Sequence, residues 1–247
     1  MGLQPSWVTP NGLLAISVDG RERYLNLTCS TLNSHASASL AKDKYMTRLI
    51  LARHGMQNIP FARPSTLAEA EAFLEKYGKI IAKPVGGAGA CDIHVVTQTV
   101  QLQALQINNY ILEKYIAGKE LRYLILNDTV IGVHRSDYGT SVEEHRPLRR
   151  ISYPQSVWSL ELIASSLHIA RVLDLKFAAI DYLIDASGYA YILEVNTTPG
   201  LKWFHAPTSG PTVDVARLFL EAMLNDLRTE TSSTPDPLGT YPLIAYS

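Results

Sequence analysis

Two carboxylates and an amide stand close together in residues 181–200, where their side chains could bind a metal ion. Apolar and aromatic residues alternate on both sides of a turn-forming segment at residues 185–188, which is typical of a hairpin. Folding the chain about this turn would place Asp181 opposite Glu194, and Asn196 would share the face of Glu194. These hard oxygen ligands predict a Mg²⁺ site, and a solvated hairpin with scattered acids is the alternative.

A second candidate site combines a lysine with a glycine-rich turn. Lys83 ends an apolar stretch and is followed by Gly86, Gly87 and Gly89. The ammonium group and the backbone N–H groups of such a turn can surround phosphate oxygens. The pattern is neither a Walker A loop nor a dinucleotide fingerprint, because no Gly-Lys-Ser/Thr closes it and a strand is expected next. By itself it fits a hairpin tip with a solvated lysine equally well.

The third candidate is an apolar stretch that begins at Tyr110 and continues through Glu113 to a turn at Gly118. The exposed backbone of such a strand can bind the edge of an adenine ring. Glu120, just after the turn, can accept hydrogen bonds from ribose hydroxyls. An ordinary strand and turn is the alternative interpretation of this segment.

The elements that must position these residues are short strands in hairpins, mixed with separate helices. Asp43 is expected to cap a helix with Met46, Leu49 and Ile50 on its apolar face and Gly55 at its end. The other expected elements are a hairpin at 11–28, a helix after the capping box of Thr66 and Glu69, strands at 79–83, 93–97 and 109–116, a hairpin at 121–134, a loop at 136–150, and helices at 154–173 (apolar face Val157, Leu160, Ile163, Leu167, Ala170) and 212–228. This mixture predicts an α+β architecture.

The composition limits which cellular compartment and which binding partners are expected. The chain has 247 residues, 47% of them hydrophobic, with a net charge of −1 and only two cysteines, Cys29 and Cys91. The chain has no excess of positive charge, so nucleic acid and anionic membranes are not expected as partners. The absence of a signal-peptide pattern, of a long apolar run and of a cysteine framework predicts a cytoplasmic protein.

Taken together and in this order, the three segments resemble the ATP-grasp superfamily of carboxylate–amine ligases. The subgroups that the chain resembles most include D-alanine–D-alanine ligase, glutathione synthetase, the ribosomal-protein glutamate ligases and cyanophycin synthetase. The most specific parts are residues 112–120 and 193–200. The resemblance implies an ATP-grasp fold, in which two α+β lobes with antiparallel sheets clasp the nucleotide. The implied division is a short N-terminal region 1–40, a small lobe 41–118, a C-terminal lobe 119–228 and a flexible tail 229–247.

The resemblance also implies roles for individual residues. Those that match nucleotide contacts are Lys44 near the phosphates, Lys83 on the α- and β-phosphates, Gly86, Gly87 and Gly89 in the loop over them, Glu113, Tyr115 and Ile116 around adenine, and Glu120 on ribose. Asp181, Glu194 and Asn196 match the ligands of Mg²⁺, for which Mn²⁺ is an alternative. Arg135 matches an arginine near the acyl-phosphate, and Arg122 matches one found in several subfamilies. Lys83, Arg122 and Arg135 are therefore the expected catalytic residues.

The implied reaction joins the carboxylate of an amino acid or peptide to an amine. The carboxylate attacks the γ-phosphate of ATP, and the amine then displaces phosphate from the acyl-phosphate. Positioning and electrostatics suffice for this chemistry, so no nucleophilic Ser or Cys is required. A phosphotransferase acting on a small molecule and a nucleotide-binding subunit that needs a partner are the alternatives.

Two departures from the family pattern affect the expected substrates. Ala179 stands where D-alanine–D-alanine ligases carry an arginine, which favours the glutathione-synthetase and glutamate-ligase side. The region before residue 41 is shorter than the N-terminal domain usual in relatives. The acceptor pocket is therefore expected from residues 11–40, from the 136–150 loop with its basic set (Arg146, Arg149 and Arg150), or from a homodimer or partner subunit.

Overall fold

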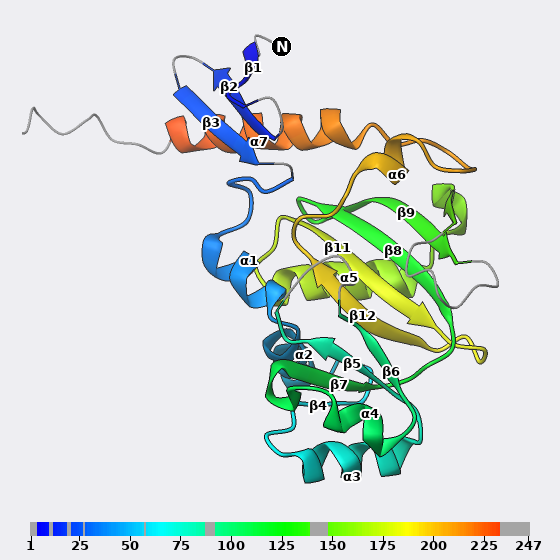
Figure 1. Ribbon diagram of the computed structural model, residues 1–247. Coiled ribbons are helices and arrows are strands. Elements are labelled where there is room, and N and C mark those ends of the chain that lie inside the picture. The colour runs from blue at the N-terminus through cyan, green and yellow to red at the C-terminus, as the bar shows by residue number, and fades with distance from the viewer. Residues whose placement is uncertain are drawn as a thin grey trace, which may run out of the picture.

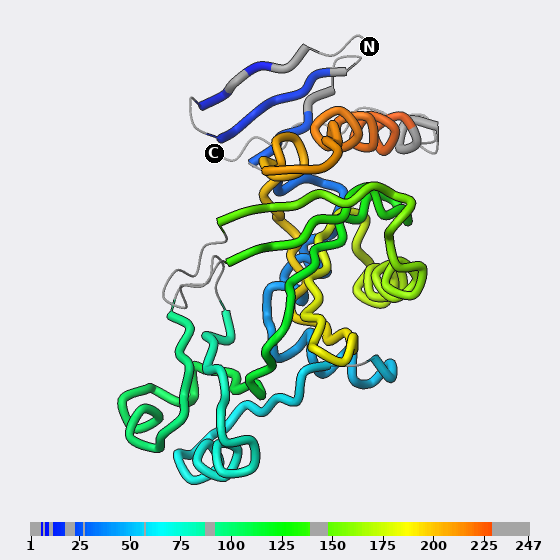
Figure 2. Tube along the Cα trace, turned by 90° about the vertical axis from the view of Figure 1, so that its right-hand side faces the viewer, coloured from blue at the N-terminus to red at the C-terminus, as the bar shows by residue number. Residues whose placement is uncertain are grey.

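Three antiparallel sheets organise the part of the chain that the computed structural model describes, which is residues 4–9, 12–18, 21–26, 28–56, 58–86, 92–138 and 148–232. Figure 1 shows the small lobe at the bottom, the five-stranded sheet in the middle, and the N-terminal strands with α7 at the top. Figure 2 shows the same succession from the side. The α+β class expected from the sequence is confirmed.

The small lobe is a four-stranded sheet covered by two helices. Its strand order is β4-β7-β5-β6, with β4 at Phe61–Ala62, β5 at Ile80–Pro84, β6 at His94–Val96 and β7 at Tyr110–Lys114. Helices α3 (Leu67–Tyr77) and α4 (Thr99–Gln103) pack on one face, where buried Leu74, Ile80 and Leu112 form the core. Thr66 caps α3 by accepting from the N–H of Glu69, as the capping pattern predicts.

The large lobe is a five-stranded sheet with order β10-β9-β8-β11-β12. Its strands are β8 (Lys119–Leu126), β9 (Thr129–Asp137), β10 (Arg149–Ser152), β11 (Phe177–Ile184) and β12 (Ala190–Asn196). The predicted hairpins β8–β9 and β11–β12 are confirmed. The predicted 136–150 loop is wrong at both ends, where pairing with a neighbouring strand extends β9 and forms β10; residues 139–147 lie outside the described part.

One face of the large sheet is covered by α5 (Leu160–Val172), which buries Ile169 and Ala170 against it. The helix predicted from the sequence starts at residue 154 and has Val157 and Leu160 on its apolar face. The structure corrects both points, because Ser159 caps the helix and these two side chains are 62% and 82% exposed. The short 3-10 segment Gln155–Val157 precedes the cap.

The opposite face of the large sheet is divided into an apolar and a polar end. At the apolar end Phe177 and Ala179 pack beneath α6 (Lys202–His205) and α7 (Val215–Ser232). The N-terminal sheet, formed by β1 (Gln4–Trp7), β2 (Leu13–Val18) and β3 (Arg21–Asn26), adds Ile16 and Leu25 to this cluster. The polar end is not part of this cluster with α6, α7 and the N-terminal sheet, and it lies nearer the small lobe (Figure 1).

Two consecutive helices, α1 (His35–Lys42) and α2 (Lys44–Arg53), lead from the N-terminal sheet to the small lobe. Asp43 caps α2, as the sequence predicts, and Ile50 of the predicted apolar face packs against the core, but the rest of that predicted face is wrong. Met46 and Leu49 are exposed, whereas Thr47, Arg48 and Leu51 are buried. Among the described residues, no helix is long and apolar enough to cross a membrane.

Residues 115–118 connect the small lobe to the large one, and Gly118 lies close to the backbone of β11. A Cβ atom at Gly118 would lie 2.5 Å from the carbonyl oxygen of Ile184. We therefore expect Gly118→Ala to lower the free energy of unfolding by about 1–3 kcal/mol, the usual cost of overpacking. Urea unfolding would measure this, with Gly200→Ala as the control because no atom lies within 4 Å of its Cβ position. Equal stability of the two variants would contradict the prediction.

Candidate active site

A row of polar side chains crosses the large sheet on the face opposite α5. Cross-strand pairing joins Ser152 to His134, His134 to Arg122, Arg122 to Asp181, and Asp181 to Glu194. Directly paired residues point to the same side of a sheet, so all five side chains share one face. We call the polar end of this face, around Arg122, Asp181 and Glu194, the site face. The predicted opposition of Asp181 and Glu194 is confirmed.

A β-bulge in β12 shapes the acidic end of the row. Asp181 pairs with Glu194 and Tyr182 with Ile192, so Leu193 is an extra residue without a counterpart on β11. Bulges bend a strand and re-aim side chains, often beside active sites. Asn196 pairs with Ala179 and therefore lies on the site face as well, where its Oδ1 accepts from the N–H of Thr198 at 2.9 Å.

Arg122 and Asp181 form a buried, two-pronged ion pair. The Nε and Nη2 atoms of Arg122 donate to the two carboxylate oxygens of Asp181 at 2.6 and 2.7 Å. Burial alone would lower the pKa of Arg122, but the charges of Asp181, Glu120 and Glu194 raise it. The guanidinium is therefore permanently charged and fixes the orientation of the Asp181 carboxylate.

Two lysines from outside the large sheet contribute positive charge near Glu194. Burial and the charge of Asp181 raise the pKa of Glu194, while Lys44, Lys83 and Arg122 act in the opposite direction. Lys44 is the first residue of α2 and Lys83 is the penultimate residue of β5, so neither lysine belongs to the large sheet. The N–H of Lys44 also donates to the carbonyl of Val85 at 3.2 Å, which ties α2 to the turn after β5.

The donor set on the site face fits Mg²⁺. Two adjacent carboxylates and an amide oxygen are hard ligands. The oxygens of Asp181 and Asn196 keep a lone pair beyond the hydrogen bonds that they accept. The raised pKa of Glu194 reflects its burial and the neighbouring charge of Asp181, both of which a bound divalent cation would offset. Asp181, Glu194 and Asn196 are the residues that would hold the ion.

Glu113 is the most deeply buried acid of the small lobe, with 1% of its surface exposed. Arg48 donates to its Oε1 from Nη2 at 2.7 Å, and Lys83 Nζ donates to its Oε2 at 2.6 Å. Burial alone would raise the pKa of Glu113, but these two cations lower it to about 2. A carboxyl with a lowered pKa stabilises the fold above its usual pKa of 4.5, and this contribution is lost as the pH falls towards 2.

A second polar group lies beside the first on the site face, centred on Glu120. Its Oε1 accepts from the Ser136 hydroxyl at 3.0 Å, and its Oε2 accepts from the Tyr138 hydroxyl. Arg150 Nη1 lies 3.7 Å from Oε1 and also donates to Ser136. The site face thus carries two acid–arginine pairs in neighbouring rows, one of Asp181 with Arg122 and one of Glu120 with Arg150.

This arrangement of two sheets with cations facing carboxylates can be compared with known proteins. A model of the RimK-like ATP-grasp domain matches residues 41–222. The chain belongs to this family. Both the resemblance seen in the sequence and the ATP-grasp fold are thereby confirmed.

Three relatives illustrate the likeness. The D-alanine–D-alanine ligase of Trichlorobacter lovleyi is 26% identical over 185 residues, covering 67% of this chain and 58% of its own. The tetrahydromethanopterin:alpha-L-glutamate ligase of Methanocaldococcus jannaschii is 22% identical, covering 72% and 65%. The crystal structure of a bifunctional glutathione synthetase from Pasteurella multocida superposes with a TM-score of 0.67 at 12% identity, covering 91% and 42%. The chain thus spans less than two thirds of the length of each of these proteins.

In this ATP-grasp domain, the strand register places Arg135 on the opposite side of the large sheet from the site face. Arg135 pairs with Leu121 and Ile151, one residue out of step with His134, and therefore belongs to the face that α5 covers. The structure does not bring it to the site face, so the expectation of a role beside the acyl-phosphate is corrected. Arg150 occupies the site face instead. Alternation along β9 puts Arg135 and His134 on opposite faces. The pairing of His134 with Arg122, and of Arg122 with Asp181, decides which of these is the site face.

The other expected residues lie around the connection between the lobes or outside the described part. Tyr115 and Ile116 are half-buried in the link after β7, and the ammonium group of Lys79 lies 3.7 Å from the ring centre of Tyr115. Gly86 is exposed, with no atom within 4 Å of its Cβ position. Gly87, Gly89, Cys91 and Arg146 lie outside the described residues.

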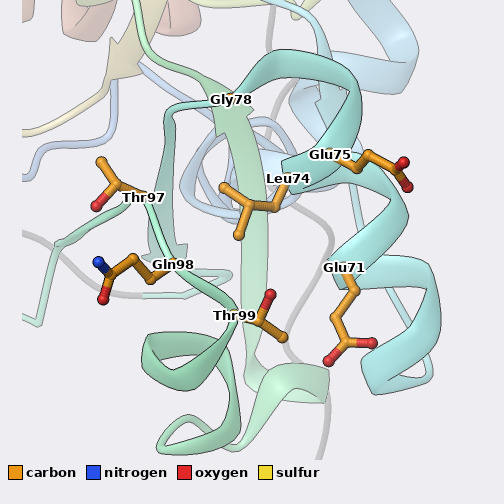
Figure 3. A pocket seen from close by; sticks show the side chains of 7 residues that line it. All are labelled: Glu71, Leu74, Glu75, Gly78, Thr97, Gln98 and Thr99. Carbon is orange, nitrogen blue, oxygen red and sulfur yellow. The ribbon is translucent and has the colours of Figure 1, made fainter.

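One surface hollow of the described chain is remote from this chemistry. It measures about 450 Å³ and lies on the helical side of the small lobe, between α3 and the turn into α4 (Figure 3). Its lining includes Glu71, Glu75 and Gln98 but no basic residue. A narrower cleft, lined by Lys44, Arg48, Leu193 and Glu194 among others, lies between α2 and β12 at the site itself. The candidate site residues thus line the narrower of these two hollows, not the more spacious one.

His134 makes the fold sensitive to acid. Burial, with the charges of Arg122 and Arg150, lowers its pKa to about 3, and neither ring nitrogen has a hydrogen-bond partner. Because unfolded histidine titrates near 6.5, this contribution to stability is full above pH 6.5 and is lost as the pH falls towards 3.

We expect His134→Leu to remove this acid sensitivity. Between pH 8 and pH 5 the free energy of unfolding of the wild type should fall by about 2 kcal/mol more than that of the variant, at about 1.4 kcal/mol per pH unit below 6.5. Urea unfolding at the two pH values would measure the difference. The exposed His168, replaced by Gln, is the control. Parallel pH profiles of wild type and His134→Leu would contradict the prediction.

Proposed function

We propose that the chain is an ATP-dependent ligase that forms an amide bond between a carboxylate and an amine, releasing ADP and phosphate. The observation that carries this proposal is the narrow cleft between α2 and β12, where Lys44 and Glu194 line the same space. The positive charges of Lys44 and Lys83 act against the raised pKa of Glu194. Acids that hold a metal, faced by lysines, suit the polyphosphate of a nucleotide. Membership in the RimK-like ATP-grasp family supports the same reaction.

In this proposal the nucleotide lies between the sheets of the two lobes. Lys83 and Lys44 bind phosphate oxygens, and the link through Tyr115 and Ile116 holds the adenine ring. Glu120 accepts from ribose. Mg²⁺ held by Asp181, Glu194 and Asn196 would offset the charge that develops on the transferred phosphoryl group.

The two arginines of the site face bind and orient the reacting carboxylate. Arg122 is held by Asp181, and Arg150 lies 3.7 Å from Glu120, so both guanidinium groups are in place before a substrate arrives. Pre-positioned cations stabilise an acyl-phosphate and its transition state without reorganisation. Arg150 thus takes the role that the sequence analysis assigned to Arg135.

The substrate class that we propose is an amino acid or a peptide carboxylate with an amine acceptor. The named relatives act on D-alanine and on glutamate. Ala179, buried beside the metal-binding row, stands where D-alanine–D-alanine ligases carry an arginine, which favours the glutamate-ligase and glutathione-synthetase side. The division into lobes at residues 118 and 119, and a second copy or partner that completes the acceptor pocket, remain predictions to be tested by limited proteolysis and by the oligomeric state.

The decisive experiment presents the protein with Mg²⁺, ATP and pairs of amino acids or dipeptides and measures ADP. Ligation predicts ADP release that needs both substrates, and a product whose mass is their sum less water. A phosphorylated product formed without any amine would establish the phosphotransferase alternative instead. Binding of ATP without turnover on any pair would favour a nucleotide-binding subunit.

A further inference from the structure

Arg48 is a buried charge that none of the expected family roles uses. It lies in the middle of α2, and only 3% of its surface is exposed. A fully buried arginine is rare unless its donors are paired. In this protein its partners come from both lobes.

On the small-lobe side, Arg48 shares Glu113 with Lys83. Its Nε and Nη2 donate to Oε1 of Glu113 at 3.1 and 2.7 Å. The Nζ of Lys83 donates to Oε2 of the same carboxylate at 2.6 Å. Each carboxylate oxygen therefore has its own cation. The position of the Lys83 ammonium is set by a carboxylate that Arg48 holds from the other side.

On the large-lobe side, Arg48 donates hydrogen bonds to the backbone of the β-bulge in β12. Its Nη2 donates to the carbonyl of Leu193 at 2.7 Å, and its Nη1 donates to the carbonyl of Ile192. Leu193 is the extra residue of the bulge, and Glu194 follows it directly. Asn58 binds Arg48 at both its side chain and its backbone. The Oδ1 of Asn58 accepts from Nη1 at 3.2 Å, and its Nδ2 donates to the Arg48 carbonyl at 3.1 Å.

We propose that Arg48 is a positioning residue that sets the two halves of the nucleotide site relative to one another. One rigid guanidinium holds Glu113, and through it Lys83, while it also holds the backbone from which Glu194 projects. The inference rests on the proposed nucleotide site. A lysine cannot replace this function, because an ammonium lacks the planar fork that reaches a carboxylate and two carbonyls together.

The test compares Arg48→Lys and Arg48→Met with the wild type. The control is Arg53→Met, which removes an exposed arginine from the last turn of the same helix. Calorimetry would measure ADP affinity with and without Mg²⁺, because Mg²⁺ strengthens binding only if Glu194 is correctly placed. We expect Arg48→Lys to bind ADP with Mg²⁺ about 10–100-fold more weakly, the usual effect of removing a residue that orients metal ligands. The strengthening by Mg²⁺ should shrink.

A second readout needs no ligand. Amide hydrogen exchange in residues 190–196 should quicken in Arg48→Lys and stay at the wild-type rate in Arg53→Met. If Arg48→Met does not fold, Arg48→Lys still provides the test, since it keeps a positive charge beside Glu113. Wild-type affinity and wild-type exchange in Arg48→Lys would overturn the inference and leave the proposed function intact. Failure of the wild type to bind any adenine nucleotide would overturn the proposed function itself.

Discussion

Replacing Glu194 by glutamine is expected to lower kcat/KM for ATP on the order of 10³-fold, the scale of effects when an electrostatic contact to the transferring group is lost. The amide keeps the shape of the side chain but removes a charge beside Asp181. The metal ion would then lose one of its two anionic ligands. Nucleotide affinity should weaken mainly in its Mg²⁺-dependent part, which titrations of ADP with and without Mg²⁺ would separate.

The matched control for this prediction is Glu161→Gln, which removes an exposed acid from the first turn of α5. It should leave turnover at the wild-type level. If Glu194→Gln also turned over at that level, the assignment of the metal ligands would be refuted. Lost turnover with an unchanged response of ADP affinity to Mg²⁺ would likewise contradict a role in metal binding.

Arg122→Met is expected to have the largest effect on stability. It removes both hydrogen bonds of the bidentate pair and leaves Asp181, only 2% exposed, as a buried charge next to Glu194. Breaking a buried ion pair from one side typically costs about 3–5 kcal/mol. Urea unfolding in the presence of EDTA would measure the loss without interference from bound metal.

Two further variants make this prediction specific to the buried pair. Arg122→Met combined with Asp181→Leu should recover most of the lost stability, because no unpaired charge remains. Arg171→Met breaks an exposed pair with Asp128 of similar length, 3.1 Å, whose side chains are 62% and 70% exposed. It should produce no measurable change. An equally small effect of Arg122→Met would contradict the structural role assigned to the pair.

Much of the site could be predicted from the sequence because it depends on local geometry. Strand periodicity of two, and a turn at residues 185–188, place Asp181 opposite Glu194 without reference to the rest of the molecule. The same reasoning predicted the β8–β9 hairpin and the cap of α2 at Asp43. Contacts between residues close in the chain follow from short-range rules, and these elements obey them.

The placement of Arg48, Arg135 and Arg150 was decided by the tertiary structure. The local sequence around each arginine does not say which side of its helix or strand is covered. Arg48 is buried, while Met46 and Leu49 on the same helix are exposed, because both lobes meet the polar side of α2. Arg150 reaches the site face only because β10 pairs with β9. The sequence by itself therefore determined the hairpin that carries the acids, through local periodicity. Which cations face those acids was decided only by the packing of distant segments.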